Sequence, residues 1–448
     1  MDTLAPASAT LSQRMADYIC SERLVNIDDA ARAKVKHVIA YHAALAFRAL
    51  AAKDPEAKRA IDVAKALSEG GGSYALIGSG DKLTLLDAAF ANCQLMRSFG
   101  LDDVIFETGV HPGLVTLPVA FALAQRQRTS GAELITAIVV GYEMLGKFAR
   151  WSWSLESPRR ATMPFGPFGS VATASRMLGF DRDRTAVALA YAAHSAMGLA
   201  ENDMGPISHF YGLVCRNGLT GALLSEAGAW GSPTVLEGRF GFIEAFLGEA
   251  ALDQNAMLAS LGHNHAIMQS CEKRYPGTGL NQVPIELMRA IVHEEGVRAH
   301  RVERIDIDLP KERENFAAGH ATGPFQPAIA PSSAAYQCAM MLLDGDLDFS
   351  RYAQTDNRDI LDVIDRTHFH FVDGKPIRYA RIVLQCKDGR RIERSGDSFF
   401  FEPETPRTLI ERHGAQILPD AQINRFLDLL ENLEDVEDAS TLVESLAL

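Results

Sequence analysis

The sequence predicts a mostly α protein with one smaller α+β domain. Apolar residues recur at three- and four-residue spacing through roughly the first 260 residues, as in amphipathic helices. Near residue 270 the pattern changes to alternating apolar and polar residues, and the tail is helical again. We therefore expect a helical domain over 1–268, an α+β domain over 269–401, and C-terminal helices over 402–448 that return to the helical domain.

The expected helices of the first domain carry strong helix formers between their apolar positions. Pro112 suits the first turn of one helix, and abundant Ala and Gly indicate close helix packing. The segments are 9–24, 27–50, 55–69, 84–100, 111–127, 130–150, 169–180 and 181–200.

The second domain is predicted from strand patterns that enclose two helical ones. RVERIDIDLP (301–310) alternates, as does RYARIVLQCKDGRRIERSG (378–396), in which Asp388–Gly389 is a hairpin signal. SSAAYQCAMMLLDG and RDILDVIDRTH, which lie between them, have the helical period. A junction between two such domains is the default place for a small ligand.

Composition excludes several classes of protein. The 448 residues carry a net charge of −13, which argues against a nucleic-acid partner because such proteins need a basic surface. No run reaches the roughly 18–20 apolar residues of a membrane span, and the first residues lack a secretory pattern. The six cysteines form no C-x-x-C pair. We expect a cytoplasmic protein, without membrane partner, that gathers cations locally if its substrate is an anion.

Three local motifs predict no chemistry. SEGGGSYALIGSGDK (68–82) lacks the phosphate-loop spacings and is interpreted as a loop. GHNHA (262–266) offers two histidines without a third metal ligand nearby. The serines form no G-x-S-x-G elbow, so a serine hydrolase has no support.

Two polar segments are candidate site loops. LDDVIFETGVHPG (101–113) places Asp102 and Asp103 near His111, which titrates close to neutral pH and can transfer protons when an acid orients it. CEKRYPGTGLNQ (271–282) places Lys273 and Arg274 before a turn. A solvated loop is the competing interpretation of each segment, and composition alone does not choose.

Six segments, taken in order along the chain, resemble the MmgE/PrpD family. They are AAFANCQLMRSFGLDD, VHPGLVTLPVAFALA, GAELITAIVVGYE, FGSVATASRMLGFDRD, FYGLVCRNGLTGALLSEAG and KRYPG. The family includes 2-methylcitrate dehydratases, cis-aconitate decarboxylases and an iminodisuccinate epimerase. The resemblance implies a large all-helical domain built from both chain ends, a smaller α+β lid domain, a homodimer, a site at the domain interface, and no metal or organic cofactor.

Four residues match family site positions and are the expected catalytic residues. Asp102 matches the acid that opens the family's L-D-x-D-D-T run, and His111 matches its H-P-[SG] histidine. Lys273 matches the lysine of K-P-Y-P, and Tyr336 matches a tyrosine before the lid helix. We expect Arg160, Arg274, His209 and Tyr142 to bind substrate.

The chain departs from the family pattern at three places. The D-D-T that should follow Asp102 is replaced within DVIFETG. A family histidine appears here as Arg160, and a family lysine appears as Ile207, with His209 close by. These positions are used by the decarboxylases, so the resemblance is weaker for that activity than for the family.

The family's reactions make or break bonds at a carbon beside a carboxylate. Such a site needs cations for the carboxylate and a base within reach. Our first hypothesis is a cofactor-independent lyase that acts on a small di- or tricarboxylate by α-proton abstraction or carbanion formation. The alternatives are an epimerase of an iminodisuccinate-like dicarboxylate that uses two bases, and a scaffold that binds a carboxylate without turnover.

Overall fold

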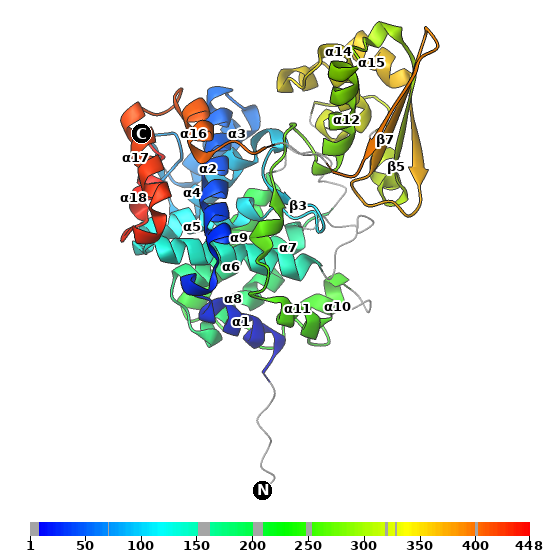
Figure 1. Cartoon of the computed structure of the whole chain (residues 1–448). Coiled ribbons are helices and arrows are strands. Elements are labelled where there is room, and N and C mark those ends of the chain that lie inside the picture. The colour runs from blue at the N-terminus through cyan, green and yellow to red at the C-terminus, as the bar shows by residue number, and fades with distance from the viewer. Residues whose placement is uncertain are drawn as a thin grey trace.

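A computed structural model describes residues 9–69, 71–150, 162–199, 209–247, 253–318, 321–327, 329–398 and 402–448. The described chain forms a large helical body and a smaller α+β body beside it (Figure 1). Each has its own hydrophobic core. The core of the helical body takes residues from Leu11 to Ile267 and again from Leu409 to Leu446, and the other core takes residues from Tyr275 to Ile392. The predicted mostly α fold with a small α+β portion is confirmed.

The helical body contains most of the predicted helices and a short hairpin in the glycine-rich segment. The hairpin joins β1 (Tyr74–Ala75) and β2 (Lys82–Leu83). The helices from the first part of the chain are α1 (Leu11–Ser21), α2 (Asp29–Ala51), α3 (Pro55–Leu67), α4 (Leu85–Arg97), α5 (Pro112–Gln127), α6 (Gly131–Arg150), α7 (Thr162–Met177), α8 (Arg182–His194), α9 (Phe210–Glu226), α10 (Phe242–Leu247) and α11 (Gln254–Ser260).

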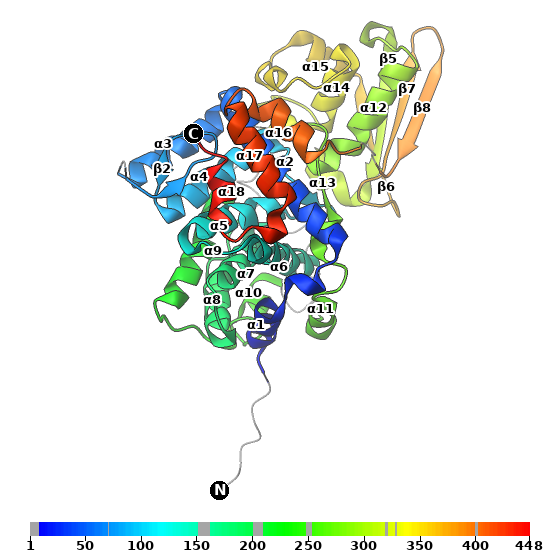
Figure 2. The same ribbon diagram turned by 60° about the vertical axis from the view of Figure 1, so that its left-hand side comes forward.

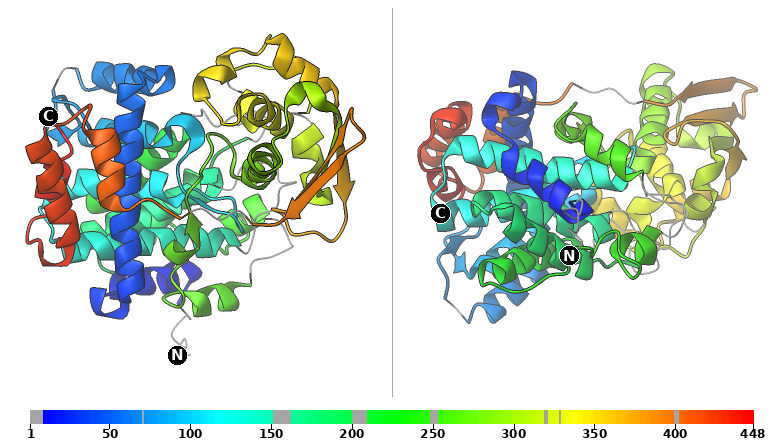
Figure 3. Two further views of the ribbon diagram at one scale, coloured as in Figure 1. Left: turned by 45° about the horizontal axis from the view of Figure 1, so that its top comes forward. Right: turned by 90° about the horizontal axis from the view of Figure 1, so that it is seen from below.

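The C-terminal tail packs on this body. Its helices are α16 (Pro406–Gly414), α17 (Asp420–Glu431) and α18 (Ser440–Glu444). Figures 2 and 3 show them beside α2 and α5, with α16 lying along α2. The tail buries Phe426, Leu430 and Leu442 in the first core, so both ends of the chain build the same core.

Small residues allow the central helices to approach closely, as the Ala- and Gly-rich sequence predicts. A Cβ on Gly141 of α6 would lie 2.1 Å from Oγ1 of Thr173 in α7, and one on Gly169 would lie 3.2 Å from the carbonyl oxygen of Gly141. Both distances are shorter than ordinary contacts, so larger residues would push α6 and α7 apart.

The smaller body, which we call the lid, is a four-stranded sheet packed against helices. Strand order is β6–β5–β7–β8, with β5 and β6 parallel and the other pairs antiparallel. Helix α12 packs on β7 and β8, and α14 packs on α12. The elements are α12 (Gln282–Glu294), β5 (Val302–Pro310), α13 (Glu314–Ala318), α14 (Ala334–Asp344), α15 (Arg358–Asp365), β6 (Thr367–Val372), β7 (Ala380–Cys386) and β8 (Arg391–Gly396).

The lid confirms the strand and helix predictions and adds α12, α13 and β6, which were not predicted. Strand β5 and the β7–β8 hairpin occur as expected, with Gly389 at a φ of 85° in the turn. Helix α12 was not predicted, although Met288, Ile291 and Val292 give it a buried face. Strand β6 was also missed because THFHFV follows α15 directly, and only its pairing with β5 defines it.

Two short strands lie where the helical body meets the lid. β3 (Val104–Ile105) pairs antiparallel with β4 (Ser270–Cys271), and Val104 stands opposite Cys271. The pair joins the two polar segments that the sequence marks as candidate site loops. No helix in the described part of the chain is long and apolar enough to cross a membrane.

Candidate active site

The β3–β4 register brings Asp102 and Lys273 together. Ile105 stands opposite Ser270 and Val104 opposite Cys271, and in an antiparallel pair each step along one strand is a step back along the other. Continued by two residues, the register places Asp102 opposite Lys273. Nζ of Lys273 lies 3.5 Å from Oδ1 of Asp102 and donates a 2.8 Å hydrogen bond to the carbonyl oxygen of Gly100.

Asp102 is the centre of a buried cluster of charges. Its side chain has no exposed surface, and it forms ion pairs with Arg97 and Lys273 and a close contact with Nδ1 of His111. Burial raises the pKa of this carboxyl group, but Arg97, Lys273 and His111 outweigh burial and hold it well below its usual value. Asp102 is therefore ionised at neutral pH.

His111 is oriented by the backbone and by Asp102. It is the residue before α5, and its N–H donates to Oγ1 of Thr162 over 3.0 Å. Its Nδ1 lies 2.5 Å from Oδ2 of Asp102 and 3.0 Å from the carbonyl oxygen of Asp103. Two acceptors at Nδ1 assign the proton to that nitrogen, which leaves the Nε2 lone pair free to accept a proton.

The side chains of this cluster differ in access. His111 keeps 14% of its side chain exposed, whereas Lys273 keeps 1% and Asp102 none. Burial, together with Lys273 and Arg97, lowers the pKa of His111 despite the attraction of Asp102. Burial also lowers the pKa of Lys273 to about 8. At neutral pH the imidazole is neutral and the ammonium is mostly protonated.

Arg97 and Tyr211 complete the cluster, and the sequence did not single out either one. Arg97 is the last residue of α4, and its guanidinium carbon lies 4.5 Å from the centre of the Tyr211 ring. The same ring meets His111 edge to face at 5.5 Å. Both residues lie inside segments that resemble the family, and this resemblance was the feature of the sequence that could have marked them as site residues.

A strained residue supports the acceptor of Lys273. Phe99 has φ 64° and ψ 2°, a left-handed conformation that is rare for bulky residues and costs about 1–3 kcal/mol. This turn directs the carbonyl of the next residue, Gly100, at the Lys273 ammonium. The carbonyl of Phe99 itself accepts from the N–H of Gly277. This hydrogen bond joins the turn before the 101–113 segment to the 271–282 segment.

Asp103 faces away from Asp102 and forms a second polar cluster. Its Oδ1 accepts from the N–H of Gly113 and lies 3.2 Å from Nε2 of His42. Its Oδ2 accepts from the hydroxyl of Tyr142 over 2.9 Å and from Ser270. Tyr142, a predicted substrate-binding residue, is thus fully buried behind Asp103 and supports the loop that carries His111.

Tyr336 lies in the core of the lid. It is fully buried, its ring stacks on Tyr352, and its hydroxyl lies 3.1 and 3.0 Å from the backbone oxygens of Arg351 and Gln354. Within the described ranges no hydrogen bond or ion pair joins it to His111 or Lys273. This placement favours a structural role in the lid over the proton transfer expected from sequence.

The other predicted substrate-binding residues lie in different places. Arg274 turns away from Lys273, with 38% of its side chain exposed and Nη1 3.6 Å from Glu286. His209 precedes α9, and its Nε2 lies 3.2 Å from the carbonyl oxygen of Glu56 in α3. Arg160, Arg159 and Ile207 lie outside the described residues.

Comparison with known proteins matches the chain to a family. The model of the MmgE/PrpD N-terminal domain matches residues 13–255, more than half of the chain. The chain belongs to the MmgE/PrpD family. Its segments that carry Arg97, Asp102, His111 and Tyr211 all fall inside the matched range.

Among MmgE/PrpD proteins, the chain is similar to cis-aconitate decarboxylases, which are lyases. It is 26% identical to the one from Aspergillus terreus over 411 residues, which cover 84% of each chain. It is 25% identical to the human one over 382 residues, 79% of this chain and 78% of the relative. The mouse protein is 25% identical over 388 residues, covering 80% and 78%.

Proposed function

We propose that this protein is a lyase that acts on a small di- or tricarboxylate of the cis-aconitate class, with His111 as the proton carrier. The observation that carries the proposal is the contact of Asp102 with His111, Lys273 and Arg97 in one buried cluster. The similarity to enzymes named cis-aconitate decarboxylase over most of the chain supports the lyase class and the substrate class.

The charge of the cluster suits an anionic substrate. Two cations, Arg97 and Lys273, contact the carboxylate of Asp102 in a buried place, so positive charge is concentrated there. A protein with a net charge of −13 repels polyanions at long range. A local positive charge in a poorly solvated site offsets this repulsion, because Coulomb attraction is stronger there than in water.

His111 supplies the proton transfer. Its Nδ1 is held by Asp102 and Asp103, so Nε2 is the atom that accepts or delivers a proton. In a decarboxylation, the bond between carbon and carboxylate breaks, CO₂ leaves, and the electron pair left on carbon takes a proton from the acid. In a dehydration, His111 takes the proton beside the carboxylate, the electron pair forms the carbon–carbon double bond, and the leaving hydroxyl takes a proton from the protonated His111 or Lys273 and departs as water. Both schemes use one positioned acid or base.

No cofactor enters either scheme. Lys273 and Arg97 supply the positive charge that stabilises an electron pair on a carbon beside a carboxylate. The reaction so written balances with solvent protons alone, and this is the basis for proposing a cofactor-independent reaction.

Epimerisation is the second candidate. It requires two proton carriers, and one observation favours it: the pKa of Lys273 is lowered by burial to about 8, so its neutral amine is accessible near neutral pH. His111 and Lys273 both contact Asp102. A two-base scheme would exchange the substrate's α-hydrogen with solvent without losing water or CO₂.

The test is a comparison of three substrates with the purified protein. Cis-aconitate, 2-methylcitrate and iminodisuccinate are each incubated in D₂O, and the mixtures are followed by NMR. We expect one of two results. Release of CO₂ should leave a new carbon–hydrogen bond in the product, and release of water should leave a new carbon–carbon double bond. Deuterium entering recovered iminodisuccinate with no release would support the epimerase instead. Saturable binding without any conversion would identify a non-catalytic scaffold.

A further inference from the structure

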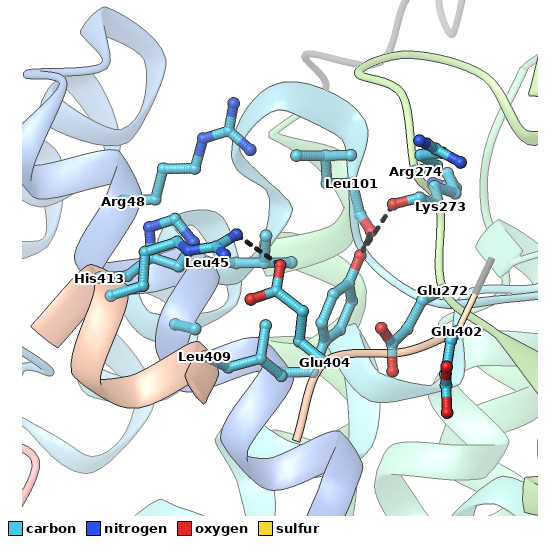
Figure 4. Close-up of a pocket in the computed structure, with 13 residues that line it drawn as sticks. Leu45, Arg48, Leu101, Glu272, Lys273, Arg274, Glu402, Glu404, Leu409 and His413 are labelled. Atoms are coloured by element: carbon cyan, nitrogen blue, oxygen red, sulfur yellow. Dashed lines mark hydrogen bonds and ion pairs between the residues drawn. The ribbon is translucent and has the colours of Figure 1, made fainter. Parts of the chain in front are cut away.

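A polar cavity lies where the chain crosses between the helical body and the lid. It has a volume of about 720 Å³, within the range of small-molecule sites. Its wall includes Leu101 and Lys273, the neighbours of the Asp102 cluster, but neither Asp102 nor His111. The returning segment at Glu402 and Glu404 closes the other side (Figure 4). We call this space the hinge cavity.

Two arginines and a histidine gather at one end of the hinge cavity. Arg48 comes from α2, and Arg412 and His413 come from α16, which lies along α2. Figure 4 shows Arg48 and His413 on the same side of the cavity, whereas Glu272 and Glu402 lie across from them. Arg412 is paired with Glu404 at 2.5 Å.

Arg48 differs from the other arginines of this cavity. No carboxylate among the described residues lies within ion-pair distance of it, and its guanidinium carbon instead lies 4.8 Å from the centre of the Phe99 ring. The residue is half-buried, and burial lowers its pKa. Asp348 attracts the guanidinium from beyond ion-pair distance, but its effect is smaller than that of burial. A guanidinium that has lost much of its water without a carboxylate in direct contact is a ready partner for an anion.

The local potential at this end is positive. Burial lowers the pKa of His413 to about 4, and the adjacent Arg48 and Arg412 lower it in the same direction. The acids of the wall do not cancel this potential at Arg48: Glu272 is paired with His37, Glu404 with Arg412, and Glu402 is exposed. An anion at Arg48 would also accept a hydrogen bond from the His413 ring.

We propose that the hinge cavity binds a small anion, a phosphate or a carboxylate, through Arg48 and Arg412 with His413 as a donor. Binding at this place goes beyond the proposed function and does not depend on it. The consequence for the active site, given next, rests on the proposed function.

An anion at Arg48 acts on the segment that supports Lys273. The ring under Arg48 belongs to Phe99, the strained residue that directs the Gly100 carbonyl at Lys273. The same ring meets Phe349 of the lid edge to face at 4.5 Å. On the other wall, Tyr41 donates to the carbonyl of Leu101, the residue before Asp102. Occupancy of the hinge cavity therefore changes the surroundings of Lys273 and the contact between helical body and lid.

The experiment uses NMR of the full-length protein labelled at the histidine rings. The His413 signal is assigned with His413→Asn, and the protein is titrated with inorganic phosphate and, separately, with tricarballylate, against chloride at equal ionic strength. We expect a saturable shift of the His413 signal with phosphate, tricarballylate or both. The two arms distinguish a phosphate from a carboxylate ligand.

Variants of Arg48 decide the proposal. Arg48→Gln should weaken anion binding at least tenfold, whereas Arg48→Lys, which keeps the charge, should retain most of it. Arg407→Gln, an exposed arginine of the same helix that is paired with Glu411, is the matched control and should bind as wild type. Absence of a saturable His413 shift, or equal affinity in Arg48→Gln, would overturn the proposal. If Arg48→Gln is unfolded, Arg412→Gln replaces it with the same expected direction.

The coupling has its own readout in the same spectra. If the hinge cavity acts on the active site, the His111 signal moves with the same midpoint as that of His413 in the phosphate titration, and it stays in place when phosphate is added to Arg48→Gln. A His111 shift that persists in Arg48→Gln would show that the anion binds at the active site itself and would overturn the coupling. A shift confined to the His413 signal would support anion binding in the hinge cavity and would contradict its coupling to the active site. Because neither readout measures turnover, failure of the proposed lyase activity is distinguished from failure of this inference.

Discussion

Nδ1 of His111 lies 2.5 Å from Oδ2 of Asp102, and the same carboxylate also pairs with Lys273 and Arg97. Asp102 therefore has two effects. It holds the proton of the ring on Nδ1, which leaves Nε2 free, and it favours the protonated forms of His111 and Lys273, which burial disfavours. The first predictions follow from these two effects.

Asp102→Asn should lower kcat/KM by about 10²–10⁴, the usual contribution of positioned acid–base catalysis. Without the carboxylate, the pKa values of His111 and Lys273 should both fall. Measuring kcat/KM against pH checks this, with thermal unfolding as the control for folding. A folded Asp102→Asn protein with near wild-type kcat/KM would contradict the role given to Asp102.

The activity should have a bell-shaped pH dependence. In the dehydration scheme a neutral His111 is required as base, and its pKa is lowered, so the acid limb lies below the ordinary histidine value of about 6.5. A protonated Lys273 is required as cation, and its pKa is about 8, so activity falls as pH rises through that value. In Lys273→Arg the alkaline limb should disappear, because arginine stays protonated. An alkaline limb unchanged in Lys273→Arg would show that another group titrates there.

Tyr142→Phe should affect stability more than substrate affinity. The hydroxyl donates to the buried carboxylate of Asp103, and hydrogen bonds to charged groups contribute about 1.5–3 kcal/mol. We expect a loss of that size in the free energy of unfolding by urea, with KM changed less than about threefold. A tenfold rise in KM at unchanged stability would restore the substrate-binding role that the sequence suggested.

The pair of His42 and Asp103 should make stability depend on pH. Burial disfavours the charged ring, but Asp103 and the carbonyl of Val38 outweigh burial and raise the pKa of His42. Stability from a raised histidine pKa is fully present below the unfolded value of about 6.5 and is lost as pH rises through the folded value. The difference in unfolding free energy between wild type and His42→Asn should therefore be larger at pH 6 than at pH 9. An equal difference at both pH values would contradict this.

Local patterns predicted most of the fold because helices and hairpins are encoded by near neighbours. The 388–389 turn and the strand over 302–310 were found this way. The β3–β4 pair was not, since Val104 and Cys271 are far apart in sequence and each strand has two residues. That pair brings Asp102 to Lys273, so the geometry of the site depended on a contact that local patterns do not show.

The same limit explains the site residues. Lys273 and Arg274 look alike in KRYP, yet Lys273 is buried against Asp102 and Arg274 is partly exposed beside Glu286. Adjacent residues of an extended chain point to opposite sides, and only the tertiary packing decides which side is the interior. Tyr336 shows the converse, because its family position suggested chemistry while its contacts lie within the lid core.

The central claim is that His111 carries the proton, and substitution of this residue tests it most directly. We would measure kcat/KM of wild type and His111→Gln on the substrate that the wild-type protein converts, with circular dichroism to verify folding. We predict a loss of at least about 10²-fold in a folded protein. A folded His111→Gln protein that turns the substrate over within a few-fold of wild type would contradict it.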